Sequence, residues 1–332
     1  SNSILTDKEK EEIDMVIVAT ESGIDQSKAA AVFVHGLLGI QPFARSFEIK
    51  EACYGATAAL HYAKLHVENS PESKVLVIAS DIAKYGVGTP GEPTQGAGSV
   101  AMLITQNPRI MAFNNDNVAQ TRDIMDFWRP NYSTTPYVNG MYSTQQYLDC
   151  LTTTWDEYKK RYDWTMDDFA AICFHLPYPK LALKGLRKMM DKTLSQEKKD
   201  SLQENFDKSI LYSQMIGNIY TGSLFLGLLS LLENADTLKA GDKIALYSYG
   251  SGAVSEFFSG ELVEGYEAYL DKERLSKLKQ RTALSVADYE KVFFEELQLD
   301  ESGSAQFAAY EHQDYALVEI LNHQRRYSKV EK

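Results

Sequence analysis

The sequence predicts an α/β protein in which helices pack on a sheet. Two short apolar runs rich in β-branched residues, MVIVA at 15–19 and KVLVIAS at 74–80, are typical of buried strands. Between them, residues 52–67 form an Ala-rich stretch of a length typical of a helix. Strands and helices that alternate at these lengths indicate helices covering the faces of a sheet.

The first third of the chain continues this alternation. Residues 27–38 are Ala-rich and end between two glycines, which predicts a helix. Residues 43–49 alternate apolar and polar side chains, as a half-buried strand does. Residues 89–98 (TPGEPTQGAG) are dense in glycine and proline and predict a loop, and SVAMLIT at 99–105 returns as a strand.

A second group of strands and helices follows an aromatic-rich stretch that begins near residue 113. We therefore expect two halves, residues 1–112 and residues 113–332, each built from strand and helix units. The same patterns predict helices at 147–162, 181–190, 195–211 and 223–233, and strands at 168–174, 243–249 and 253–258. The last stretch of about 70 residues is mainly amphipathic and charged, and no short repeat of the solenoid type is present.

Composition excludes several classes of protein. With 34 basic and 46 acidic residues among 332, the formal net charge is −12, whereas a general nucleic-acid binder needs a basic face. No apolar run reaches the ~18 residues of a membrane span. The three cysteines, Cys53, Cys150 and Cys173, form no paired framework and no zinc motif, which is typical of a reducing compartment. We expect a cytoplasmic protein without a metal or a bound cofactor.

Cys53 is the clearest candidate for catalysis. It precedes the small-residue helix in EACYGATAAL, and a helix N-terminus offers free N–H groups and a partial positive charge. Both favour the thiolate, which is the nucleophilic form of cysteine. The other interpretation, a buried structural cysteine, is about equally supported, because free cysteines are often buried.

Two further side chains stand at the ends of predicted strands. His175 ends a strand in CFHLPYPK, where catalytic groups are often found; a histidine with a purely structural role is the more common case. Glu21 follows the strand MVIVA directly, and a carboxylate there is expensive to bury unless it is paired or used. Its alternative role is to cap the helix that follows.

Two other patterns fit a ligand but have ordinary explanations. The stretch SYGSGAV at 248–254 predicts a glycine turn between strands, which is able to aim a backbone N–H at an oxyanion, although most such turns are hairpins. Four basic residues recur at helical spacing in an otherwise acidic chain and suit a phosphate-bearing ligand, or simply a solvated helix face. These residues are Lys180, Lys184, Arg187 and Lys188.

At these residues the sequence resembles the bacterial-type 3-hydroxy-3-methylglutaryl-CoA (HMG-CoA) synthases, over nearly the whole chain. Seven blocks in the right order carry the resemblance and are far more specific than any single motif. They are ATESGIDQSKAAA (19–31), GLLGIQPFARSFEIKEACYGAT (36–57), GEPTQGAGSVAML (91–103), DFWRP (126–130), FHLPYPK (174–180), GNIYTGSL (217–224) and SYGSG (248–252).

The resemblance implies a thiolase-like fold, a duplicated αβαβα layered unit that works as a homodimer. It implies condensation of acetyl-CoA with acetoacetyl-CoA and water to HMG-CoA and CoA, in the mevalonate route to isoprenoids, with CoA thioesters as substrates and no cofactor. Cys53 corresponds to the acylated nucleophile, Glu21 to the general acid/base and His175 to the catalytic histidine. Substrate contacts are implied for Thr94, Ser143, Lys184, Asn218 and Ser251, and a pocket lining for Tyr54, Asp81, Tyr85, Asp126 and Lys180.

The resemblance also raises an expectation about the start of the chain. Family members carry about sixty residues before the first matching block, including a strand of the first sheet, and its loss would expose a sheet edge. An N-terminally truncated chain, weakly active or inactive, is therefore one alternative. Another is a different condensing enzyme of the superfamily, similar to ketoacyl-ACP synthase III, although those lack a glutamate at the position of Glu21. A Cys-His hydrolase is a remote third.

Overall fold

The first sheet of the computed structural model, which describes residues 5–308 and 314–330, has the strand order β2-β1-β3-β4. Strand β1 runs parallel to β2 and β3, whereas β4 is antiparallel to β3. The strands are β1 (Ile13–Ala19), β2 (Arg45–Ile49), β3 (Lys74–Ala83) and β4 (Gly96–Thr105). Helix α1 (Asp7–Glu12) precedes β1, α2 (Ala30–Leu38) connects β1 to β2, and α3 (Gly55–Asn69) connects β2 to β3.

The second sheet has the order β5-β11-β10-β9, and β6 also pairs with β11. Strand β10 is parallel to β9 and forms a hairpin with β11 across the predicted glycine turn. The strands are β5 (Met111–Phe113), β6 (Val118–Thr121), β9 (Ala171–Phe174), β10 (Lys243–Gly250) and β11 (Val254–Leu262). The first sheet thus lies before residue 106 and the second after residue 110.

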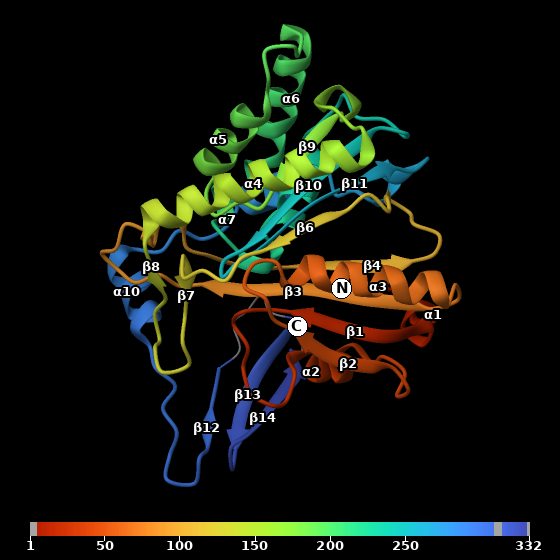
Figure 1. Cartoon of the computed structure of the whole chain (residues 1–332). Helices are drawn as coiled ribbons and strands as arrows, with labels where there is room; N and C mark the ends of the chain where they lie inside the picture. The colour runs from red at the N-terminus through yellow and green to blue at the C-terminus, as the bar shows by residue number, and fades with distance from the viewer. Residues whose placement is uncertain (1–4, 309–313, 331–332) are drawn as a thin grey trace.

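The remaining elements cover the sheets or extend from them (Figure 1). The helices are α4 (Gly140–Tyr162), α5 (Pro179–Met189), α6 (Gln196–Ser209), α7 (Leu211–Ile216), α8 (Ser223–Asn234), α9 (Arg274–Lys279) and α10 (Val286–Phe294). Short strands β7 (Phe127–Trp128) and β8 (Tyr137–Val138) form one ribbon, and β12 (Ala305–Gln306), β13 (Tyr315–Leu321) and β14 (Gln324–Lys329) form another sheet.

Alternation of side chains along the strands divides the core into layers. In β1, Val16 and Val18 pack with α2 on one face, while Met15 and Ile17 face α3 and α8 on the other. In β10, Leu246 belongs to that same central cluster, whereas alternate residues of β9 and β10 pack against the outer helices α4, α5 and α6. Helix, sheet, helix, sheet and helix therefore follow one another, which confirms the predicted α/β fold with an αβαβα layering.

The central layer explains the small residues at the start of α3. Ala56, Ala59 and Ala63 are fully buried there, between the two sheets. Large side chains at these positions would hold the sheets apart, because protein interiors leave few voids and little space for extra volume. The apolar helix α8 fills the rest of the layer with Leu224, Phe225 and Leu231.

Most predicted elements are confirmed, with shifts at their ends. The helix predicted at 52–67 begins three residues later, because residues 51–54 make the turn that presents Cys53. The helix predicted at 195–211 is α6, which ends at Ser209, and a separate helix, α7, begins at Leu211. Strands β5 and β6 and the β13–β14 hairpin were not predicted, since short or charged edge strands carry little periodicity. None of the helices in residues 5–308 and 314–330 has the length and apolar character needed to cross a membrane.

Candidate active site

A strained turn presents Cys53 between β2 and α3. Ala52 has a φ of 39°, in the left-handed region that residues other than glycine rarely adopt. The backbone N–H of Tyr54 donates to the carbonyl of Glu51 at 2.9 Å and closes the turn. Cys53 is buried, with 9% of the residue exposed, at the N-terminal end of α3. Strain of this kind is found mainly at functional sites.

Glu21 and Cys53 form a hydrogen-bonded pair. The thiol donates from Sγ to Glu21 Oε1 at 3.2 Å, although 32 residues separate them. Burial and the neighbouring charge of Asp81 raise the pKa of Glu21 to about 8, and Arg129 and the thiol oppose this only in part. Burial, followed by the Glu21 charge, raises the pKa of Cys53 as well. The expectation that the helix N-terminus leaves Cys53 as a thiolate is therefore wrong: near neutral pH, the thiol keeps its proton and has Glu21 as acceptor.

Asp81, at the end of β3, holds the loop that carries Glu21. Its Oδ1 accepts hydrogen bonds from Thr20 Oγ1 at 2.8 Å and from the backbone N–H groups of Glu21 and Ser22 at 2.9 and 3.0 Å. Its Oδ2 accepts the backbone N–H of Thr221 at 3.0 Å and also the Thr221 hydroxyl. Asp81 is 2% exposed, so this network is shielded from water and joins the two halves.

The raised pKa of Glu21 predicts how the free energy of unfolding depends on pH. Because the folded pKa is about 8 and the ordinary value 4.5, the fold binds this proton more tightly than the unfolded chain. The contribution of this proton to the free energy of unfolding is fully present below pH 4.5 and is lost as the pH rises through about 8. Glu21→Gln removes the titrating group, so the variant should gain about 2–4 kcal/mol over the wild type between pH 5 and pH 9.

Urea unfolding of both proteins at several pH values measures this difference. Glu48→Gln, a carboxylate on β2 that accepts the Ala30 N–H at 2.7 Å, is the control in the same sheet. A stability difference between Glu21→Gln and wild type that does not change with pH would contradict the assignment.

His175 directly follows β9 and is 3% exposed. Its backbone N–H donates to the carbonyl of Tyr247 at 2.7 Å, and its own carbonyl accepts the hydroxyl of Tyr147 at 2.9 Å, so the residue is fixed on both sides. Burial lowers the pKa of His175 to about 3, and the imidazole is therefore neutral at pH 7. Nδ1 is buried without a hydrogen-bond partner, which is costly unless a ligand supplies one.

An aromatic group encloses the thiol of Cys53. Tyr220 and Ala83 are buried in one cluster with Cys53, and Tyr85 and Phe127 pack against it. The three rings meet one another at centroid distances of 5.8–6.0 Å. Such rings exclude water around the thiol.

Asn218 links these aromatics to the neighbouring loops. Its Nδ2 donates to the Tyr85 hydroxyl at 2.8 Å, and its Oδ1 accepts the N–H of Tyr220 at 2.9 Å. Its backbone N–H donates to the carbonyl of Thr94 at 2.9 Å, which brings the predicted loop at 89–98 to the site. The Thr94 hydroxyl itself donates to the carbonyl of Gly91.

Asp126 fixes the glycine turn of β10 and β11. Its Oδ1 accepts the N–H of Gly252 at 2.9 Å, and its Oδ2 accepts the Tyr249 hydroxyl at 2.7 Å and, at 3.4 Å, the hydroxyl of Ser143. Gly252 has a φ of 121°, which a residue with a side chain rarely adopts. Ser251 precedes it and is partly exposed.

The remaining predicted residues occupy two other places. Lys180 and Lys184 are exposed on α5, which begins four residues after His175 and carries Arg187 and Lys188 further along. Tyr54 has its hydroxyl on Glu256, 2.6 Å from Oε2, so its polar end is already engaged. Glu256 itself was not predicted. A charged residue inside the mostly apolar predicted strand AVSEFF (253–258) was the signal in the sequence.

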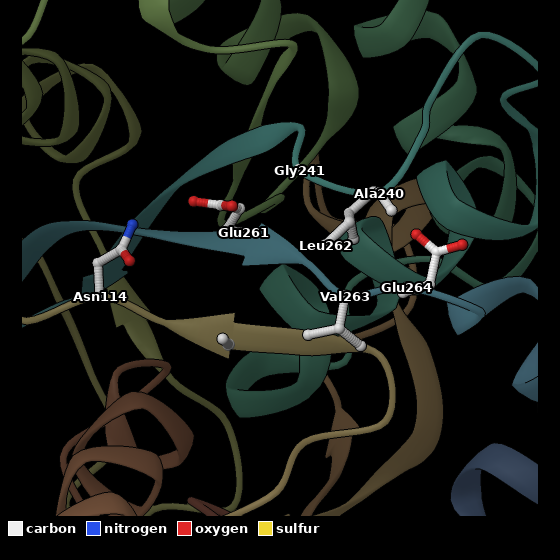
Figure 2. A pocket seen from close by; sticks show the side chains of 8 residues that line it. Asn114, Ala240, Gly241, Glu261, Leu262, Val263 and Glu264 are labelled. Carbon is white, nitrogen blue, oxygen red and sulfur yellow. The ribbon is translucent and has the colours of Figure 1, made fainter.

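A surface groove of about 510 Å³ lies elsewhere, between the far end of β11 and the turn before β10 (Figure 2). Glu261, Leu262 and Glu264 line it. At about 3.3 Å per residue, the far end of β11 lies roughly 25 Å from the glycine turn. The groove therefore has no contact with Cys53 or Glu21, and its carboxylates do not suit an anionic ligand.

Comparisons with known proteins agree with one another. A family model described as hydroxymethylglutaryl-coenzyme A synthase N terminal matches residues 4–109, and the corresponding C terminal model matches residues 117–202 and 186–314. The hydroxymethylglutaryl-CoA synthase of Enterococcus faecalis is 56% identical over 302 residues, which cover 90% of this chain and 78% of that protein.

Solved structures show the same similarity. The crystal structure of an HMG-CoA synthase complexed with CoA superposes with a TM-score of 0.97 at 68% identity, over 99% of this chain and 85% of that one. A second structure, in complex with 3-hydroxy-3-methylglutaryl coenzyme A, has a TM-score of 0.84 at 31% identity, over 99% of this chain and 84% of that one.

Proposed function

Because the chain belongs to the hydroxymethylglutaryl-CoA synthase family, and is by that membership an acyltransferase, we propose that it forms HMG-CoA through an acetyl thioester on Cys53. The observation that carries this proposal is the hydrogen bond from the Cys53 thiol to Glu21 inside an aromatic enclosure. A buried thiol hydrogen-bonded to a carboxyl group is a nucleophile whose base is in position and becomes available as that carboxyl ionises, near pH 8.

In the first step, Sγ of Cys53 attacks the carbonyl carbon of acetyl-CoA. A carbon–sulfur bond forms to Cys53, the bond to the CoA sulfur breaks, and the thiol proton passes by way of Glu21 to the departing CoA thiolate. The backbone N–H groups of Cys53 and Ser251 bind the oxygen on which negative charge develops. The tight approach of the glycine turn to the nucleophile supports this role, because an alanine Cβ at Gly250 would lie 2.7 Å from the Tyr54 nitrogen.

In the second step, Glu21 removes a proton from the methyl group of the acetyl thioester. The same two N–H groups hold the enolate, whose carbon attacks the ketone of acetoacetyl-CoA. His175 hydrogen-bonds that ketone and passes a proton to the new alkoxide, and the proton that Glu21 took from the methyl group replaces it, so that Glu21 is again a carboxylate; the neutral imidazole with its unpartnered Nδ1 supports this role. Water then hydrolyses the Cys53 thioester with help from Glu21, which releases HMG-CoA.

The substrate contacts follow from the same proposal. Thr94, Ser143, Asn218 and Ser251 bind the acyl portions, with Asp81, Tyr85 and Asp126 shaping the pocket around them. Lys180 and Lys184 bind the phosphates of CoA; their exposure on the helix after His175 supports this, since a phosphate needs accessible cations. We further propose that the protein works as a cytoplasmic homodimer in the mevalonate route to isoprenoids.

Product analysis tests the proposal. The purified chain, mixed with acetyl-CoA and acetoacetyl-CoA, should yield HMG-CoA and free CoA in equal amounts by mass spectrometry. Replacing acetoacetyl-CoA by malonyl-ACP should yield no condensation product, which distinguishes the proposal from a reaction of the ketoacyl-ACP synthase III type. Condensation with malonyl-ACP, or hydrolysis of acetyl-CoA with no product when both substrates are present, would contradict it.

A further inference from the structure

A buried carboxylate lies in the central layer, on the strand that follows the glycine turn. The side chain of Glu256, in β11, is 1% exposed. It shares a face of β11 with Phe258, which packs in the central apolar cluster. A carboxylate in such surroundings costs several kcal/mol unless donors replace its lost water.

Two hydrogen-bond donors and a histidine surround this carboxylate, and each comes from the nucleophile helix, from its N-cap or from the segment before β6. The hydroxyl of Tyr54 donates to Oε2 at 2.6 Å, and Asn117 Nδ2 donates to Oε1 at 2.9 Å. His61 Nε2 lies 2.8 Å from Oε1. Burial alone would raise the pKa of Glu256, but His61, Tyr54 and Asn117 together lower it, so the side chain is ionised near neutral pH.

The position of Tyr54 connects this cluster to the reacting atoms. Tyr54 follows Cys53 directly and is the N-cap residue of α3. Its backbone is in close contact with Gly250, where an added Cβ would lie 2.7 Å from the Tyr54 nitrogen and from the carbonyl oxygen of Glu51. Gly250 is the last residue of β10, and Ser251 comes next.

Glu256 belongs to the same hairpin as Ser251. In the register of that hairpin, Glu256 lies opposite Ser248, and Val254 lies opposite Gly250. The Tyr54–Glu256 hydrogen bond therefore ties the segment of Cys53 to the strand pair that carries Ser251.

We propose that Glu256 is a positioning residue for the nucleophile: through Tyr54 it sets the Cys53 backbone against the glycine turn, so that the Cys53 and Ser251 N–H groups converge on one oxygen. This inference deepens the proposed function and rests on it. Glu256 itself contacts no substrate atom, because Tyr54 and helix α3 lie between Glu256 and the reacting atoms.

A second hydrogen bond joins α3 to β10 independently of Glu256, so the test can isolate the effect of Glu256. Thr57 Oγ1 donates to Ser248 Oγ at 2.8 Å, and both residues are buried. This bond holds the first turn of α3 on β10 without Glu256. A variant at Glu256 should therefore keep the layers together and disturb mainly the alignment of Cys53, a displacement that is small in space and large in its effect on rate.

The experiment compares Glu256→Gln and Tyr54→Phe with the wild type in the full chain. We expect Glu256→Gln to slow acetylation of Cys53 by acetyl-CoA about 10–100-fold, somewhat less than the ~10²–10³-fold cost of losing an oxyanion donor outright. Free CoA, which has no acyl carbonyl, should bind with unchanged Kd. Tyr54→Phe should also slow acetylation. The double variant should be no slower than the slower single variant, because both substitutions remove the same Tyr54–Glu256 hydrogen bond.

Asp116→Asn is the matched control for a merely structural effect. Asp116 is a buried carboxylate, 5% exposed, and accepts the N–H of Ser259 on β11 at 3.0 Å and the hydroxyl of Tyr158 on α4 at 2.6 Å. It faces the outer helices rather than α3. Asp116→Asn should lower the Tm as Glu256→Gln does, with the acetylation rate of the folded protein unchanged.

Three results would overturn the inference. One is acetylation at the wild-type rate in Glu256→Gln. Another is an equal loss of rate in Asp116→Asn at the same Tm, and a third is a Kd for CoA that rises in proportion to the loss of rate. Failure of the proposed function looks different: the wild type itself takes up no acetyl group, and the inference about Glu256 then falls with it.

Discussion

Replacing Cys53 with serine should abolish the uptake of an acetyl group from acetyl-CoA. A serine hydroxyl is a far weaker acid than a thiol, and Glu21, with a pKa of about 8, is too weak a base to ionise it. Wild-type protein mixed with acetyl-CoA should gain the mass of one acetyl group in an intact-mass measurement, and overall turnover of the variant should fall at least ~10⁴-fold, as for other lost nucleophiles.

Cys150 and Cys173 are the internal controls for this experiment. Both are buried and free, and burial raises the pKa of each. Neither has a carboxylate hydrogen-bonded to its sulfur among the described residues, so neither should be acetylated. Cys150→Ala and Cys173→Ala should keep the mass gain. An acetyl group found by peptide mapping at either position, instead of at Cys53, would refute the assignment of the nucleophile.

Replacing Glu21 with glutamine should separate the two half-reactions. The methyl group of a thioester is a much weaker acid than a thiol, so the loss of the base costs condensation more than acetylation. We expect acetylation to fall at most about tenfold and condensation to fall ~10²–10⁴-fold, the usual contribution of a positioned acid or base. The variant should therefore accumulate acetylated Cys53, visible by intact mass, and form almost no HMG-CoA.

A pH profile adds a check on the same residue. In the wild type, acetylation should speed up as the pH rises towards about 8, because the Cys53–Glu21 pair must lose a proton before the sulfur attacks. In Glu21→Gln this rise should move to higher pH, since the thiol then ionises alone in a buried place. Equal losses in both half-reactions, or an unchanged profile, would exclude Glu21 as the base.

Much of the fold was predictable from patterns that are local in the chain. Strands β1, β3 and β10 are continuous apolar runs, and such runs predict buried strands wherever they pack. The small residues at the start of α3 indicated close packing before any partner was known. The short strands β5 and β6 were not predictable in this way, because they pair with β11, more than 130 residues later, and carry little pattern of their own.

The candidate site, like the fold, was predictable from the sequence only in part. Cys53, Glu21 and His175 each stand where a predicted strand meets a turn or a helix, and that position, together with the matching blocks, singled them out. Their protonation could not be predicted from position. The helix N-terminus of Cys53 favours a thiolate, yet burial and the charge of Glu21 outweigh it and keep the proton on sulfur.

The sequence by itself determined the layered α/β architecture, the family, and which side chains are candidates for the chemistry, because these depend on residue type, spacing and order. Only the tertiary structure decided that the Cys53 thiol donates to Glu21, and that a buried Glu256 ties Tyr54 to the opposite sheet. Both contacts join residues from distant parts of the chain. Their energies depend on distance and on the exclusion of water, and no local sequence pattern determines either of these.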